Sequence, residues 1–250
     1  MHFNTHSLRR TYAIALGKFF FGYRNVLGPA IFLLALALSR PQYPLGRQDL
    51  NIAFDAAGVV LVLLGQLIRV VTIGYEYIVR GGRNRHVYAD DLVQGGMFAL
   101  SRNPLYFGNV LIAVGLSLVI NAHAFYLIVI PLIVLAYSTI VAAEEAYLRE
   151  KFGTQYEDYC GRVNRWWPRL MNFRSAVSAM RFNWKRVLLK EYNTTFVLFG
   201  LLVCLYVWSR YSVQGAAALP SRGVFFAGAL AWAMLYLAVR ALKKGGYVRQ

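Results

Sequence analysis

The chain has 250 residues, of which 58% are hydrophobic and 15% are charged, and Lys and Arg outnumber Asp and Glu by 27 to 11. Its mean hydropathy of +0.44 lies above that of soluble globular domains. Two cysteines are too few for a disulfide framework. Nucleic-acid binders gather their cations on one face of a folded domain. Here the cations stand between long apolar runs, which indicates a membrane protein and disfavours a nucleic-acid partner.

Six mostly apolar runs predict transmembrane helices, because about 20 such residues cross the ~30 Å hydrocarbon core of a bilayer. They are Phe19–Leu38, Ile52–Ile73, Tyr106–Ile120, Phe125–Ala143, Thr195–Trp208 and Val224–Val239. We therefore expect an all-α, polytopic transmembrane helix bundle of about six spans.

The distribution of Lys and Arg predicts how these spans are oriented. If the N-terminus is cytosolic, the cytosolic segments carry 22 of the 27 Lys and Arg residues, and the opposite side carries four. Cytosolic loops of membrane proteins are enriched in Lys and Arg. We expect a multi-pass integral membrane protein with both termini in the cytosol.

The loop 74–105 between the second and third spans has few signals of regular structure. It contains Gly81-Gly82, Gly95-Gly96 and Ser101-Arg102-Asn103-Pro104. Gly-rich backbone exposes N–H groups, and Pro104 suits the first position of a helix, whose N-terminus favours an anionic group. The loop is therefore either part of an anion-binding site or a plain connector.

The fourth span ends in the adjacent carboxylates Glu144 and Glu145. Acidic residues beside a span are costly and usually face the protein interior or a polar cavity. The pair predicts a site for a cation or a ribose diol, the alternative being a solvated helix end.

A short helix is predicted after the fourth span. Gly153 ends the preceding helix, and Thr154 with Glu157 matches a capping box that opens a new one. An apolar stripe at three- and four-residue spacing follows, which favours packing over ligand contact. Its members are Tyr156, Tyr159, Cys160 and Val163.

The C-terminal part has a different pattern. Between residues 178 and 192, apolar and basic side chains fall on opposite sides, as in an amphipathic helix lying on an anionic leaflet. We expect a core over residues 1–170, with its motifs in 90–170. Residues 171–250 then form the interfacial helix and a C-terminal transmembrane hairpin.

Motifs of several common site types are missing from the sequence. There is no G-x-G-x-x-G after a strand, no P-loop, no H-E-x-x-H and no His/Cys cluster at metal-ligand spacing. No metal site is predicted, and a soluble Rossmann-type enzyme is unsupported.

Three motifs stand in order around one predicted helical hairpin. They are residues 96–108 (GMFALSRNPLYFG), residues 144–159 (EEAYLREKFGTQYEDY) and residues 165–168 (RWWP). Together they resemble the isoprenylcysteine carboxyl methyltransferase family, to which membrane enzymes that methylate phospholipid amines are related. The resemblance covers about residues 90–170.

The resemblance implies an S-adenosylmethionine-dependent methyltransferase. Its cytosolic helical loop region would close a cofactor pocket at the cytosolic face, and a lipid tunnel would open into the bilayer. The implied cofactor-binding residues are Leu92, Val93, Arg102, Asn103, Pro104, Tyr106, Glu144, Glu145, Tyr156 and Tyr159. The implied catalytic residues are Arg102, Glu145 and Arg165. The family usually has His where Asn103 stands and often His where Asp90 stands, so histidine-based roles are not carried over.

The implied acceptor is a membrane lipid or a prenylated small substrate with a carboxylate, entering from the bilayer. Three alternatives stay open: a phospholipid amine N-methyltransferase, an NADPH-dependent membrane sterol-type reductase, and a non-catalytic membrane protein of the same fold. The reductases share an Arg-x-Pro-x-Tyr-x-Gly segment. The Glu144-Glu145 pair disfavours them, because two carboxylates suit a cationic donor better than a cofactor with extra phosphates. The sequence leaves the oligomeric state open.

Overall fold

The computed structural model describes residues 5–76, 87–169, 171, 173–178, 180–216 and 221–244. Gly81-Gly82 of the loop 74–105 lies outside the described residues. Over the described ranges the regular structure is helical throughout, with no strand. The helices are α1 (Thr5–Leu38), α2 (Asn51–Tyr75), α3 (Pro104–Ile120), α4 (Ile130–Phe152), α5 (Thr154–Arg162), α6 (Phe173–Val177), α7 (Trp184–Gln214) and α8 (Arg222–Lys244), with short helical turns at Pro44–Gly46, Gln48–Leu50, Gly96–Ala99 and Phe125–Val129.

The chain is an all-helical, multi-pass integral membrane protein, as the sequence predicts. Five helical stretches are long and apolar enough to cross a membrane: Leu8–Leu38, Gln48–Tyr75, Phe125–Phe152, Trp184–Gln214 and Gly223–Lys243. The remaining expected span is α3, which has 17 residues. It rises about 25 Å, at the short limit for a membrane crossing. Pro104 begins α3, and Asn121 ends it in a left-handed conformation with φ of 42°.

The two antiparallel helices α2 and α3 pack with their backbones in close contact. A Cβ atom at Gly58 would lie 2.6 Å from the carbonyl oxygen of Gly115, and one at Gly65 would lie 2.5 Å from that of Gly108. Glycines at such positions let membrane helices approach closely enough for dispersion contacts to hold them together. The seven-residue spacing on both helices repeats the contact two turns apart.

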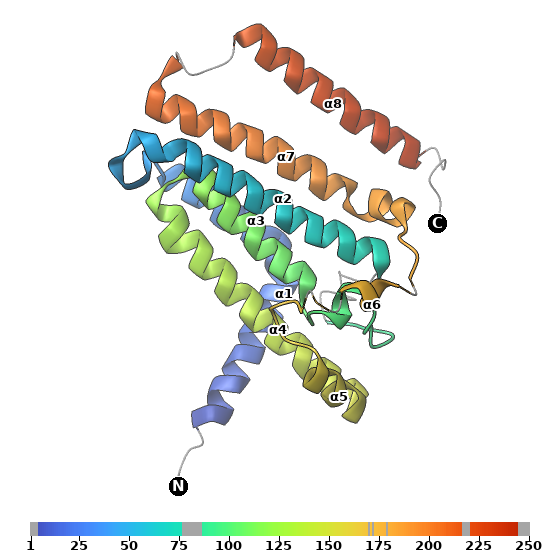
Figure 1. Ribbon diagram of the computed structural model, residues 1–250. Coiled ribbons are helices and arrows are strands. Elements are labelled where there is room, and N and C mark those ends of the chain that lie inside the picture. The colour runs from blue at the N-terminus through green and yellow to red at the C-terminus, as the bar shows by residue number, and fades with distance from the viewer. Residues whose placement is uncertain are drawn as a thin grey trace.

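The helix α1 crosses α4 at another glycine. A Cβ atom at Gly17 would lie 1.9 Å from the carbonyl oxygen of Thr139. Figure 1 shows that the N-terminal part of α1 then diverges from α4 toward the end of the bundle where α5 lies. The core is at the opposite end, where buried side chains from α1, α2, α3 and α7 pack around Phe125, which is 0% exposed.

Polar contacts attach α7 to α2 along its length. Arg210 donates to Asp55 at 2.6 Å, and the Gln66 amide donates to Thr195 at 2.8 Å. A third contact, between Arg69 and Glu191, is described with the site below. The helix α8 lies on the outer side of α7 (Figure 1).

The structure places residues 184–192 of the expected interfacial helix in the first turns of α7. Asn183 caps this helix by accepting a hydrogen bond from the Arg186 N–H at 2.8 Å. No Gly or Pro stands between Tyr192 and the apolar run that follows, so the helix continues without a break into the membrane-spanning part. The basic side chains of 185–190 therefore lie on the end of a long helix.

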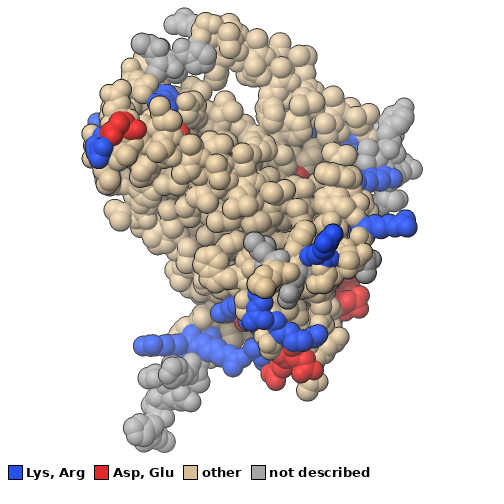
Figure 2. Space-filling model, in the orientation of Figure 1, with Lys and Arg blue, Asp and Glu red and all other residues tan. Residues whose placement is uncertain are grey.

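Charged side chains are distributed unevenly over the surface. Figure 2 shows a middle region almost free of Lys, Arg, Asp and Glu, with charges gathered toward the end of the bundle where α5 lies. This is the pattern expected of a protein whose middle faces hydrocarbon and whose ends face water.

We predict that the α2–α3 contact tolerates no side chain at Gly65. The Gly65→Leu variant should unfold at lower temperature in detergent, because the new side chain meets the Gly108 backbone rather than a flexible group. Its free energy of unfolding should fall by about 1–3 kcal/mol or more. The control is Gly28→Leu in α1, where no atom lies within 4 Å of an added Cβ. Equal melting temperatures for the two variants would show that the close contact does not form.

Candidate active site

A cavity of about 770 Å³ opens at the end of the bundle where α3 begins and α4 ends. Its wall combines side chains from α1, α2, the segment 87–98, α3, α4, α5 and α7. The ten residues for which the sequence implies cofactor binding all line it: Leu92, Val93, Arg102, Asn103, Pro104, Tyr106, Glu144, Glu145, Tyr156 and Tyr159. Arg165, the remaining expected site residue, lines a neighbouring cavity instead.

Backbone hydrogen bonds join the segment before α3 to the segment after α5. The Arg102 N–H donates to the Asn164 carbonyl at 2.9 Å, and the Arg169 N–H donates to the Leu100 carbonyl at 3.2 Å. These bonds hold together two parts of the sequence motif that are about 60 residues apart. They fix the backbone from which Arg102 and Arg165 extend.

Asn103 has a positional role in this arrangement. Its side chain is 8% exposed, and its amide Nδ2 donates to the Arg165 carbonyl at 3.0 Å. Asn103 stands at the N-cap of α3 but makes no side-chain capping bond there. Histidine, which is usual at this position in the family that the sequence resembles, also has an N–H donor.

The adjacent carboxylates on α4 point to different partners, because successive residues of a helix are turned by about 100°. Glu144 accepts a hydrogen bond from the Tyr106 hydroxyl at 2.7 Å. The Tyr106 ring lies 5.0 Å from that of Tyr137, and Arg24 of α1 donates to the Tyr106 hydroxyl at 3.4 Å. The Tyr106 hydroxyl therefore fixes the position of the Glu144 carboxylate.

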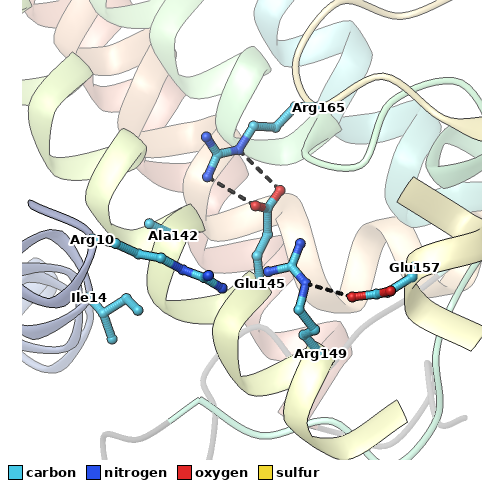
Figure 3. A pocket seen from close by; sticks show the side chains of 7 residues that line it. All are labelled: Arg10, Ile14, Ala142, Glu145, Arg149, Glu157 and Arg165. Atoms are coloured by element: carbon cyan, nitrogen blue, oxygen red, sulfur yellow. Dashed lines mark hydrogen bonds and ion pairs between the residues drawn. The ribbon is translucent and has the colours of Figure 1, made fainter. Parts of the chain in front are cut away.

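Glu145 lies between two guanidinium groups. Arg165 approaches one side of its carboxylate, with an ion pair of 3.0 Å (Figure 3), and Arg102 approaches at 3.4 Å. Burial alone would lower the pKa of Arg102, but the combined effect of Glu145, Cys160 and Tyr156 outweighs burial and raises that pKa above its ordinary value. Arg102 also donates to Cys160, while its buried Nε has no acceptor among the described residues.

The short helix α5 closes the cavity on one side. Gly153, with φ of 52°, reverses the chain after α4, as the sequence predicts. Tyr156 and Tyr159 are 1% and 4% exposed, and the Tyr159 hydroxyl donates to the Phe98 carbonyl at 2.7 Å. Burial raises the pKa of both phenols above the ordinary value, so both stay protonated donors at neutral pH.

The predicted capping box at the start of α5 is wrong. Gly153 is the N-cap, Thr154 is already the first helical residue, and no side chain caps this end. Glu157 instead pairs with Arg149 at 3.5 Å. Because of the tight turn at Gly153, the helix begins one residue earlier than predicted. The Thr154 hydroxyl is therefore not at the capping position.

Contacts from α4 and α5 also position the segment 87–98, which carries Leu92 and Val93. Lys151 donates to the Ala89 carbonyl, and Arg162 donates to the Gln94 side chain at 3.1 Å. Leu92 packs against the buried cluster of Tyr156 and Tyr159. The apolar stripe predicted on α5 thus packs, as expected, and two of its tyrosines also face the cavity.

The sequence reasoning missed a polar network on the membrane side of the cavity. Arg69 of α2 donates through Nε to Glu191 of α7 at 2.7 Å, and it also donates to Asn109 of α3. The Asn109 amide donates to the Tyr137 hydroxyl on α4 at 3.1 Å. Arg69, Asn109 and Tyr137 line the cavity, as does Thr194 of α7. An arginine inside an apolar span was the signal, because such a charge requires a partner within the protein.

Comparison with known proteins finds similarity to methyltransferases. Residues 54–155 match the model of the phospholipid methyltransferase family. The chain is 30% identical over 123 residues to a probable protein-S-isoprenylcysteine O-methyltransferase of Oryza sativa, in both subspecies indica and japonica, which covers 44% of this chain and 59% of that protein. It is 29% identical over 115 residues to protein-S-isoprenylcysteine O-methyltransferase B of Arabidopsis thaliana, with 42% and 55% covered. The chain thus matches less than two thirds of the length of these relatives. No solved structure matches it significantly.

We predict that Asn103 acts as a hydrogen-bond donor to the Arg165 backbone. Asn103→Asp has nearly the same shape but presents a carboxylate, which repels the carbonyl, so the segment 164–169 should lose amide protection in hydrogen exchange. The free energy of unfolding of Asn103→Asp should be lower by about 1–3 kcal/mol. Asn103→His, which keeps an N–H donor, is the matched control and should retain protection. Equal exchange in Asn103→Asp and the unmodified protein would contradict this role.

Proposed function

We propose that this chain, which carries a domain of the phospholipid methyltransferase family over residues 54–155, transfers a methyl group from S-adenosylmethionine to a lipid-like acceptor. The observation that carries the proposal is one cavity, lined by all ten residues for which the resemblance implies cofactor binding. The names of the plant relatives support the isoprenylcysteine-type carboxylate as acceptor. A phospholipid amine is the alternative acceptor, favoured by the family model.

The residues of the cavity fit such a cofactor. Its volume lies within the range of about 300–1,000 Å³ typical of ligand pockets. Glu144 and Glu145 are suited to an ammonium group or a ribose diol, and Arg102 to a carboxylate. The buried Nε of Arg102, which lacks an acceptor among the described residues, is a donor that an anionic ligand group would satisfy.

The chain contributes positioning and the exclusion of water. The cofactor supplies a methyl group on a positively charged sulfur, from which a nucleophile displaces it in line. Positioning a reactant can lower the barrier of such a step by several kcal/mol. Tyr156 and Tyr159 close the cavity with nearly fully buried rings. Exclusion of water by these residues would strengthen the attraction between a cationic donor and an acceptor carboxylate held there.

A carboxylate acceptor needs no general base, whereas an amine acceptor must lose a proton, which a glutamate of the cavity would accept. In our proposal Arg102 or Arg165 holds an anionic group, and Glu144 or Glu145 meets the cofactor. The acceptor enters from the bilayer, and the site lies on the cytosolic face, as the excess of Lys and Arg at that end of the spans supports.

The reductase alternative, which would use NADPH, is less compatible with the cavity. Two carboxylates, Glu144 and Glu145, form part of its wall. A cofactor with several phosphates would be repelled by them, although Arg102 partly compensates their charge. Measuring NADPH binding beside S-adenosylmethionine binding distinguishes the two classes.

We predict that S-adenosylmethionine binds the purified protein in detergent and that Arg102→Ala and Glu145→Ala weaken this binding at least about tenfold, as expected for losing a hydrogen bond to a charged group. Isothermal titration calorimetry measures the dissociation constants. The matched controls are Arg9→Ala and Glu150→Ala, which remove the same charges from exposed positions outside the cavity. Unchanged affinity in both cavity variants would remove the site assignment.

We also predict that membranes containing the protein transfer a labelled methyl group from S-adenosylmethionine to a lipid-extractable acceptor. For a carboxylate acceptor the product is an ester, so mild base should release the label. A label that resists base would indicate a phospholipid amine instead. Arg102→Ala membranes serve as the control, and a label in the extract that is independent of the protein would contradict the proposal.

A further inference from the structure

We propose that the second cavity, which lies between α1, α4 and the segment after α5, binds the phosphate group of an anionic membrane phospholipid. Its volume is about 530 Å³. The residues that line it are Arg10, Ile14, Ala142, Glu145, Arg149, Glu157 and Arg165 (Figure 3). This site adjoins the candidate active site, with which it shares Glu145, but lipid binding at Arg10 does not depend on the function proposed there.

The divergence of α1 from α4 creates the cavity. The two helices touch at Gly17 and Thr139. Toward its N-terminus, α1 then separates from α4 (Figure 1), and Arg10 and Ile14 face the opened space. On α4 this space is lined by positions 142, 145 and 149, whereas positions 137, 144 and 148 line the first cavity. The two cavities therefore lie against adjacent faces of α4, and Glu145 is the one residue that lines both.

The charges of the second cavity favour an anion. Three guanidinium groups from three different segments face two carboxylates, so the lining has a net positive charge. Arg165 pairs with Glu145, and Arg149 pairs with Glu157 at 3.5 Å. Arg10 has no hydrogen bond or ion pair with any residue that the structure describes. Figure 3 shows its side chain extending from α1 toward α4 and ending beside Glu145.

Phosphate is the anion that suits this set of groups. A guanidinium presents several N–H donors in a rigid fork that fits two oxygens of a phosphate at once. Arginines on α1, on α4 and after α5 approach from different directions, and a tetrahedral group with several oxygens can contact more than one of them. The exposed pair of Arg149 and Glu157 contributes little stability by itself and can rearrange around a ligand.

The position of the cavity indicates that the phosphate belongs to a lipid. The membrane-spanning stretches that carry Arg10 and Arg149 begin at Leu8 and end at Phe152, so both arginines lie near the ends of spanning helices, where such helices meet the headgroups. Exposed apolar side chains continue along α1 from this point, with Tyr12 at 72% and Phe19 at 50% exposure. They offer a surface for acyl chains below a bound headgroup.

Lipid binding to the purified full-length protein tests this site. Short-chain phosphatidylglycerol is titrated against the unmodified protein, Arg10→Ala and the matched control Arg9→Ala. Arg9 is also exposed on α1, but it does not line the cavity. We expect Arg10→Ala to weaken the affinity about tenfold and Arg9→Ala to leave it within twofold. Equal affinities of the two variants would overturn the site.

Two further probes identify the group that is recognised. Diacylglycerol of the same chain length lacks the phosphate and should not bind at the concentrations used. If diacylglycerol binds with the same affinity as phosphatidylglycerol, the phosphate assignment is overturned. Inorganic phosphate should compete only at much higher concentration. If it binds as tightly as the lipid, the proposed lipid source is wrong. Binding of S-adenosylmethionine to Arg10→Ala should be unchanged, because Arg10 does not line the first cavity.

Discussion

The close backbone contact between α2 and α3 is the constraint on which the site depends. Because Gly65 and Gly108 bring the two helices together, the aliphatic part of Arg69 passes over Gly108, where an added Cβ would lie 3.0 Å from its Cγ. From there the guanidinium reaches Asn109 on α3 and Glu191 on α7. A larger residue at Gly108 would displace Arg69 and with it the membrane side of the cavity. The glycines therefore determine a polar arrangement as well as a packing distance.

The pair of Arg69 and Glu191 gives the C-terminal part of the chain a place in the site. Glu191 is 0% exposed, and removing either partner of such a pair leaves an uncompensated buried charge, at a cost of about 3–5 kcal/mol. A buried ion pair is weak evidence of net stability, but it specifies which helices must be adjacent. Since Thr194 also lines the cavity, α7 belongs to the wall although it lies outside the family match at residues 54–155.

Much of the fold follows from the sequence, because a bilayer restricts the choices. Apolar runs long enough to cross it must be helical, since the hydrocarbon offers no partner for backbone N–H and C=O groups. The motif around Arg102 and the Glu144-Glu145 pair predicted residues that converge, because their helices form one hairpin. In contrast, the sequence alone did not predict that Arg69 pairs with Glu191, 122 residues away, since many cations were available. Nor did the amphipathic pattern of 178–192 show that residues 184–192 continue into a spanning helix.

The two adjacent glutamates have different electrostatic surroundings, which suggests how one cavity can hold groups of opposite charge. Glu145 is compensated by Arg102 and Arg165, so the three groups together carry a positive charge suited to a carboxylate. Glu144 instead accepts a hydrogen bond from the neutral Tyr106 hydroxyl. In the proposed function, an amino-acid-like cofactor has its carboxylate near Arg102 and a cationic group near Glu144. The sequence places the carboxylates side by side, and the turn of the helix directs them to different partners.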